Sequence, residues 1–127
     1  MATNTCDLGP RMPLRGLVRM TPERARRGYR LTCFLTSMRD PAARAAFRAD
    51  PQASMAAFGL SEAECALVRN RDYDGMLDWG ASNVAIGKAS PALGTTLVER
   101  GAKGRGQTVA DFMTERRARN EGQAWRF

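Results

Sequence analysis

Histidine is absent from this sequence of 127 residues. If the chain acts alone, this absence excludes acid–base catalysis by an imidazole and any metal site with histidine ligands. Cysteine is scarce: Cys6, Cys33 and Cys65 lie far apart and form no pair at a metal-binding spacing. Cys33 and Cys65 stand among apolar residues, where a reduced cysteine behaves as a small hydrophobic side chain. We therefore expect no cofactor and no metal ligand in this chain.

Long hydrophobic runs are also missing. No stretch of about 18 consecutive apolar residues occurs, so the sequence predicts no membrane-spanning helix. The N-terminal segment is polar and contains Gly9, Pro10 and Pro13 where a signal peptide needs apolar residues. The expected location is therefore the cytoplasm, without membrane contact.

Strict alternation of apolar and polar residues, the pattern of a half-buried strand, occurs only briefly at Thr95–Val98. Helix start signals are frequent instead. Each signal begins with a side chain that can cap a helix. The capping residue is followed directly by proline, or by an acidic residue three positions later, or by apolar residues at helical spacing. They are Thr21 with Pro22, Asp40 with Pro41, Asp50 with Pro51, Ser61 with Glu64, Asp72, Ser82 or Asn83, and Thr108 with Asp111. The predicted fold class is all-α.

These signals predict a compact bundle of five to seven short helices. Gly28 is expected to end a first short helix, after which an apolar stripe at helical spacing begins the next. The stripe consists of Leu31, Phe34, Leu35 and Met38. Four glycines between residues 94 and 106 predict a long loop over residues 89–107, before a C-terminal helix.

The domain organisation follows from this reading. Residues 1–20 carry no helical or strand period and are expected to form an extended N-terminal arm. Residues 21–119 are expected to form the helical domain, and residues 120–127 a C-terminal tail.

Arginine supplies most of the net charge of +7, a composition that suits nucleic-acid binding. The arginines are scattered from Arg11 to Arg126, however, and acids interrupt them. The cluster RARRGYR at residues 24–30 fits a solvated face, a phosphate-contacting patch or a protein interface, since interfaces favour arginine and tyrosine. The glycine segment GAKGRG lacks P-loop spacing and follows no strand, so it predicts a connection rather than a phosphate site.

An ordered set of short motifs resembles the small (alpha) subunits of LigAB-type extradiol dioxygenases, the family of protocatechuate 4,5-dioxygenase. The resemblance covers about residues 21–119. The matching positions are Arg24–Tyr29, Leu31, Phe34, Phe47–Asp50, Leu60, Ser61, Arg71–Tyr73, Met76, Asp78, Gly80, Asn83, Val84, Lys88, Gly106, Thr108, Asp111 and Phe112.

The resemblance implies a function that this chain performs with a partner. In that family a larger beta subunit holds one Fe(II) on two histidines and a glutamate, and the all-helical small subunit closes the mouth of the active site. The absence of histidine from this chain agrees with a partner subunit that supplies the iron ligands. The implied activity is ring cleavage of a protocatechuate- or gallate-like catecholic acid at the subunit interface, with no catalytic residue in this chain.

The resemblance also places two groups of residues. The segment after Gly80 is expected to form a substrate lid, whose members are Ser82, Asn83, Val84, Ile86 and Leu93. The partner interface is expected to include Arg24, Arg27, Tyr29 and Trp79. Trp79 fits the hydrophobic core as well, because the large indole side chain favours burial. No aromatic residue occurs between Gly80 and Asp111, so the lid is expected to accept a bulky ring.

Two other hypotheses remain. One is a stand-alone helical binding module, for which nucleic acid is the candidate ligand; steep salt dependence of binding would favour it. The other is a member of the same family that works without an iron-bearing partner.

Overall fold

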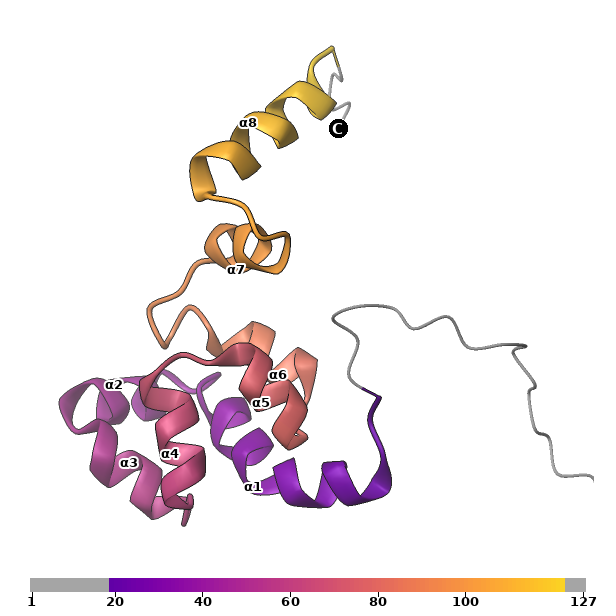
Figure 1. Ribbon diagram of the computed structural model, residues 1–127. Coiled ribbons are helices and arrows are strands. Elements are labelled where there is room, and N and C mark those ends of the chain that lie inside the picture. Colours follow the sequence, from indigo (N-terminus) through magenta and orange to yellow (C-terminus); the bar gives the residue numbers. More distant parts are fainter. Residues whose placement is uncertain (1–18, 123–127) are drawn as a thin grey trace, which may run out of the picture.

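The computed structural model describes residues 19–122, in which every element of regular secondary structure is an α-helix (Figure 1). The all-α prediction is confirmed. The helices are α1 (Pro22–Ser37), α2 (Pro41–Ala49), α3 (Pro51–Ala57), α4 (Glu62–Arg69), α5 (Tyr73–Trp79), α6 (Asn83–Ala89), α7 (Leu97–Gly104) and α8 (Val109–Asn120). These eight helices exceed the expected five to seven by one.

Helix N-termini lie where capping side chains predicted them. The Thr21 hydroxyl accepts a hydrogen bond from the amide of Arg24 at 3.2 Å and caps α1. Ser61 and Glu64 form the reciprocal capping box of α4, in which each side chain accepts a bond from the other residue's amide. Such bonds satisfy amides that have no acceptor within the helix, and each cap contributes about 1 kcal/mol.

Helix α1 runs without a break through Gly28, where the sequence predicted a helix end. A glycine inside a helix costs about 0.5–1 kcal/mol relative to alanine. Here the position is buried against the turn after α5, and a Cβ atom on Gly28 would lie 2.1 Å from the carbonyl carbon of Gly80. Gly28 therefore permits close packing and does not terminate the helix.

The apolar stripe of α1 forms the centre of the core, as the sequence predicted. Leu31, Phe34 and Leu35 are fully buried. The ring of Phe34 meets the rings of Phe47 in α2 and Phe58 after α3 edge-on, with centroids 5.8 and 5.5 Å apart. Burying one such large side chain contributes about 1.5–3 kcal/mol, so the Phe34 contacts help to attach α2 and the end of α3 to α1.

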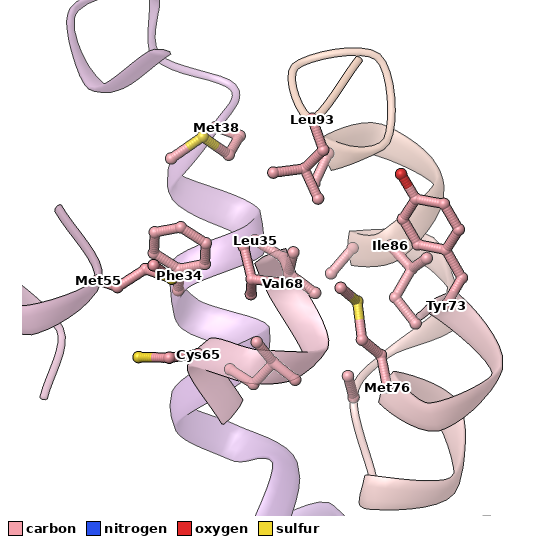
Figure 2. Close-up of a cluster of buried hydrophobic side chains, with 14 residues drawn as sticks. Phe34, Leu35, Met38, Met55, Cys65, Val68, Tyr73, Met76, Ile86 and Leu93 are labelled. Atoms are coloured by element: carbon pink, nitrogen blue, oxygen red, sulfur yellow. The ribbon is translucent and has the colours of Figure 1, made fainter. Parts of the chain in front are cut away.

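Figure 2 shows how the other helices enclose α1. Met55 of α3 lies on one side of Phe34, and Val68 of α4 lies beside Leu35. Met76 of α5 and Ile86 of α6 are fully buried on the other side. The core thus joins α1 to α3, α4, α5 and α6 in one cluster.

The loop expected over residues 89–107 contains helix α7, which corrects the prediction. Thr96 and Glu99 form its capping box. A Cβ atom on Gly101 would lie 2.8 Å from the tip of the Phe112 ring in α8, so this glycine permits α7 and α8 to pack closely. The two helices pack on each other and project from the body formed by α1–α6 (Figure 1).

Residues 1–18 and 123–127 lie outside the described part of the chain. Cys6, most of the expected N-terminal arm and most of the expected tail fall there, so the predicted division into arm, domain and tail stays a prediction. Among the described helices none is long and apolar enough to cross a membrane.

Candidate functional site

The residues expected at a partner interface and those expected in a substrate lid meet where α1 crosses the junction of α5 and α6. Gly80 ends α5 in the left-handed conformation, with φ of 117°. A Cβ atom on Gly80 would lie 1.8 Å from the carbonyl oxygen of Arg24, so both backbones approach too closely for any larger residue. This crossing brings Ser82 to Thr32 of α1, whose hydroxyl accepts a hydrogen bond from the Ser82 amide at 3.0 Å.

Two arginines of α1 hold this crossing together. Arg27 donates to the carbonyl oxygens of Trp79 at 2.8 Å and of Asp78 at 2.7 Å. These carbonyls belong to the last turn of α5, which has no helical donor for them. Arg24 forms an ion pair with the Asp78 carboxylate at 3.3 Å. Both guanidinium groups therefore have acceptors within the chain, and their contact with a partner stays a prediction.

Trp79 lies half-buried at the edge of the core. The guanidinium carbon of Arg27 lies 4.7 Å from the centroid of its ring, which is a cation–π contact. The indole N–H is buried and has no hydrogen-bond acceptor among residues 19–122. The sequence left Trp79 open between the core and the interface. In this structure the ring links α5 to α1, and its contact with a partner stays a prediction.

Tyr29 is the exposed aromatic residue of the expected interface, with 68% of its surface accessible. Two hollows meet at Tyr29 and Thr32. One of about 690 Å³ follows α1 past Cys33 to Arg39, and one of about 390 Å³ extends to the α5–α6 junction. Hydrogen bonding and charge interaction with the Cys33 thiol raise the pKa of the Tyr29 phenol. A tyrosine phenol is neutral at pH 7 even with its ordinary pKa, so Tyr29 is able to donate a hydrogen bond.

Ser82 and Asn83 of the expected lid line the smaller hollow together with Tyr29. Ser82 caps α6, since its hydroxyl accepts a bond from the Ala85 amide at 3.4 Å. Val84, in the first turn of α6, is 64% exposed. The start of α6 therefore offers the polar residues Ser82 and Asn83 beside Tyr29, and one exposed apolar side chain, Val84, next to Asn83 in the chain.

The other two lid residues are not on the surface. Ile86 is 0% exposed and Leu93 is 5% exposed, and both belong to the hydrophobic core. Figure 2 shows Ile86 packed among the buried side chains beside Met76. Their expected place in the lid is therefore corrected: they support α6 and the following turn from beneath. The lid that stays a prediction consists of Ser82, Asn83 and Val84.

Thr32 was missed by sequence reasoning, although it joins α1 to α6 and lines both hollows. The sequence offered one signal for it. Thr32 is a polar residue that follows Leu31 in α1 and lies off the apolar stripe, so its hydroxyl is available to a neighbouring segment.

The described residues do not fit an iron site. No group of three or more acidic, cysteine or histidine side chains is close enough to hold a metal ion within residues 19–122. Cys65 is buried in the core, and Cys33 is half-buried on the outer face of α1.

Comparison with known proteins shows the family. The model of the family described as "Aromatic-ring-opening dioxygenase LigAB, LigA subunit" matches residues 31–117, which is more than half of the chain. The chain belongs to the LigA family. The matched region thus runs from Leu31 in α1 to most of α8 and includes the α5–α6 junction. It contains the expected lid residues and Trp79, whereas Arg24, Arg27 and Tyr29 precede it.

A curated relative supports the same assignment. Gallate dioxygenase of Pseudomonas putida is 38% identical to this LigA chain over 103 residues, which make up 81% of this chain and 30% of the relative. The chain therefore spans less than a third of the length of the relative that it matches.

Proposed function

We propose that this chain is an accessory subunit of an Fe(II)-dependent extradiol dioxygenase that cleaves the ring of a gallate- or protocatechuate-like catecholic acid. The observation that carries the proposal is the match to 30% of a gallate dioxygenase by a chain without histidine. The larger, unmatched part of that relative has the length needed for a separate catalytic unit. We infer that the iron, which activates the catecholic substrate and oxygen, is held by a partner subunit in the cytoplasm.

In the proposed reaction this chain covers the active site of the partner subunit and helps to position the substrate. Tyr29 and Asn83 are exposed and line a hollow of about 390 Å³, and the exposed Val84 follows Asn83 on the first turn of α6. An apolar cover with a few polar groups excludes water from a partner's site and restrains the substrate. Neither role needs an acid or a base from this chain. The neutral Tyr29 phenol is available to donate a hydrogen bond to an acceptor of the partner or substrate.

Reconstitution tests the proposal. The tagged chain is purified from its source cells with the iron-binding chain that copurifies, and the two are then separated under anaerobic conditions. Oxygen uptake with gallate, protocatechuate and catechol is measured for each chain alone and for the recombined pair with Fe(II). We expect uptake only from the recombined pair, and faster with the two acids than with catechol. Equal uptake by the iron-binding chain alone and by the pair would contradict the accessory role.

A further inference from the structure

A third hollow, away from the crossing of α1 and α5, is lined mainly by positively charged side chains. It has a volume of about 300 Å³ and lies between the turn after α4 and helix α7. Arg71 and Tyr73 line it from the α4–α5 side, and Arg100 and Lys103 line it from α7. It therefore lies where the projecting α7–α8 pair joins the helical body (Figure 1).

The charges of this hollow are unbalanced. Arg71, Arg100 and Lys103 contribute three positive charges, and Glu99 contributes the one negative charge among the lining residues. Glu99 is already engaged, because its carboxylate accepts a hydrogen bond from the Thr96 amide at 2.7 Å in the capping box of α7. Within residues 19–122, none of the three cationic side chains forms an ion pair. An anion entering the hollow would meet donors that this part of the chain leaves unused.

Arg71 is held there by a strained backbone. It is the one non-glycine residue in the described range with positive φ, at 51°. The corresponding position after α3 is Gly59 and that after α5 is Gly80, which adopt this conformation without a steric penalty. A guanidinium nitrogen of Arg71 would lie 3.2 Å from a Cβ atom on Gly94, so the small residue at position 94 leaves room for it. Strain of this kind in native proteins concentrates at ligand sites.

The opposite wall of the hollow is ordered by contacts between α7 and the body. The Tyr73 hydroxyl donates a hydrogen bond to the Thr95 hydroxyl at 2.7 Å. The guanidinium carbon of Arg100 lies 5.2 Å from the centroid of the buried Tyr73 ring. Arg100 is thereby positioned before any ligand arrives, which reduces the entropy lost on binding.

We propose that this hollow is an anion site that takes a carboxylate or phosphate group with at least two free oxygens. Guanidinium groups suit such groups because they donate two parallel hydrogen bonds to them. The bound anion joins Arg71 of the body to Lys103 of α7 and so fixes the α7–α8 pair on the body. Its source is either a free small anion or an acidic side chain of the partner subunit. The second source rests on the proposed function.

The first experiment measures free anions on the full chain. Inorganic phosphate and citrate are titrated by calorimetry and by thermal unfolding, with sodium chloride at equal ionic strength as reference. The double variant Arg71→Gly/Lys103→Gln removes two of the cations, and glycine at position 71 relieves the backbone strain, so the variant is expected to fold. The control is Arg48→Gln, an exposed position in α2. We expect the double variant to bind at least about tenfold more weakly, equivalent to about 1.4 kcal/mol, and the control to bind as the original chain does.

The second experiment measures assembly with the iron-bearing subunit for the same variants. If the partner supplies the carboxylate, free phosphate will have no effect beyond sodium chloride, and the double variant will assemble about tenfold more weakly than the control. Binding of a free anion that the double variant loses supports the first source, and needs no partner. If the double variant matches the control in both experiments, the anion site is overturned, whatever becomes of the accessory role.

Discussion

Gly28 of α1 and Gly80 at the end of α5 lie in direct backbone contact. A Cβ atom on Gly28 would fall 2.1 Å from the Gly80 carbonyl carbon, and one on Gly80 would fall 1.8 Å from the Arg24 carbonyl oxygen. Backbone atoms cannot move aside as a flexible side chain can. The crossing that brings Tyr29 beside Asn83 therefore depends on two residues without side chains.

Replacing Gly28 by alanine should destabilise the chain. The added methyl group overlaps backbone atoms of the α5–α6 junction, and such overpacking costs about 1–3 kcal/mol or more. The matched control is Gly104→Ala at the end of α7, where a Cβ atom meets nothing within 4 Å. The control should be neutral or more stable by up to about 1 kcal/mol. Urea unfolding of both variants gives the comparison, and equal midpoints would contradict the tight crossing.

Arg27→Ala should lower stability by about 1–2 kcal/mol. The variant loses hydrogen bonds to the carbonyl oxygens of Asp78 and Trp79 and the cation–π contact with the Trp79 ring. Arg27→Lys keeps the charge but not the planar fork, so its loss should be intermediate. Arg26→Ala is the control, because Arg26 is exposed and forms no ion pair within residues 19–122. If thermal unfolding gives the same melting temperature for Arg26→Ala and Arg27→Ala, the bonds made by Arg27 contribute nothing to stability.

Glu115 should make the pairing of α7 with α8 sensitive to acid. Hydrogen bonding from Gln107, at 2.7 Å, is the main cause that lowers the pKa of this carboxyl group, and Arg105 and Arg119 add to it. A carboxyl group with a lowered pKa in the folded state stabilises it above the ordinary value of 4.5. That contribution is lost as the pH falls through the lowered value.

The measurement is hydrogen exchange of α8 amides at pH 7 and pH 3.5, in the original chain and in Glu115→Gln. We expect the variant to weaken protection of α8 at pH 7, and the difference to shrink at the lower pH as the carboxylate becomes protonated. Glu121→Gln, at the end of the same helix and without an ion pair in the described range, is the control. Its effect at pH 7 should be small, because an acid at a helix C-terminus is slightly unfavourable. A difference that persists unchanged at pH 3.5 would exclude the carboxylate as its cause.

Val84→Trp should alter substrate choice in the reconstituted complex. Val84 is exposed on the first turn of α6, so a larger side chain there enlarges the cover without disturbing the core. We expect kcat/KM to fall more for the bulkier of two catecholic acids, by about tenfold, or about 1.4 kcal/mol. Ile86→Trp is unsuitable for this test, because Ile86 is fully buried and the variant would disrupt packing.

The control for the lid is Val109→Trp on α8, the same substitution at an exposed valine of the projecting helix pair. It should leave kcat/KM unchanged for both acids. Equal kinetics for Val84→Trp and Val109→Trp, with assembly intact, would show that the first turn of α6 does not reach the substrate.

The sequence alone determined where seven of the eight helices of residues 19–122 begin, all except α7. Asp50, Ser61 and Asp72 cap helices at the predicted positions, because capping depends on a side chain and amides only two or three residues away. It also determined the central stripe of α1, since a period of 3.6 residues is a property of one segment. The motifs that indicated the LigA family were also readable from the sequence, because each is a short run of neighbouring residues.

Tertiary structure decided what each glycine and each apolar residue does. Gly28 and Gly101 have the same local effect as a helix-ending glycine, yet each lies inside a helix because another backbone or ring packs against it. Ile86 and Val84 are two apolar residues of one short helix, but one is fully buried and the other is mostly exposed. Which of the two residues is buried depends on which face of α6 packs against α1. That contact is set by residues about 50 positions earlier in the chain, as the bond from Ser82 to Thr32 shows.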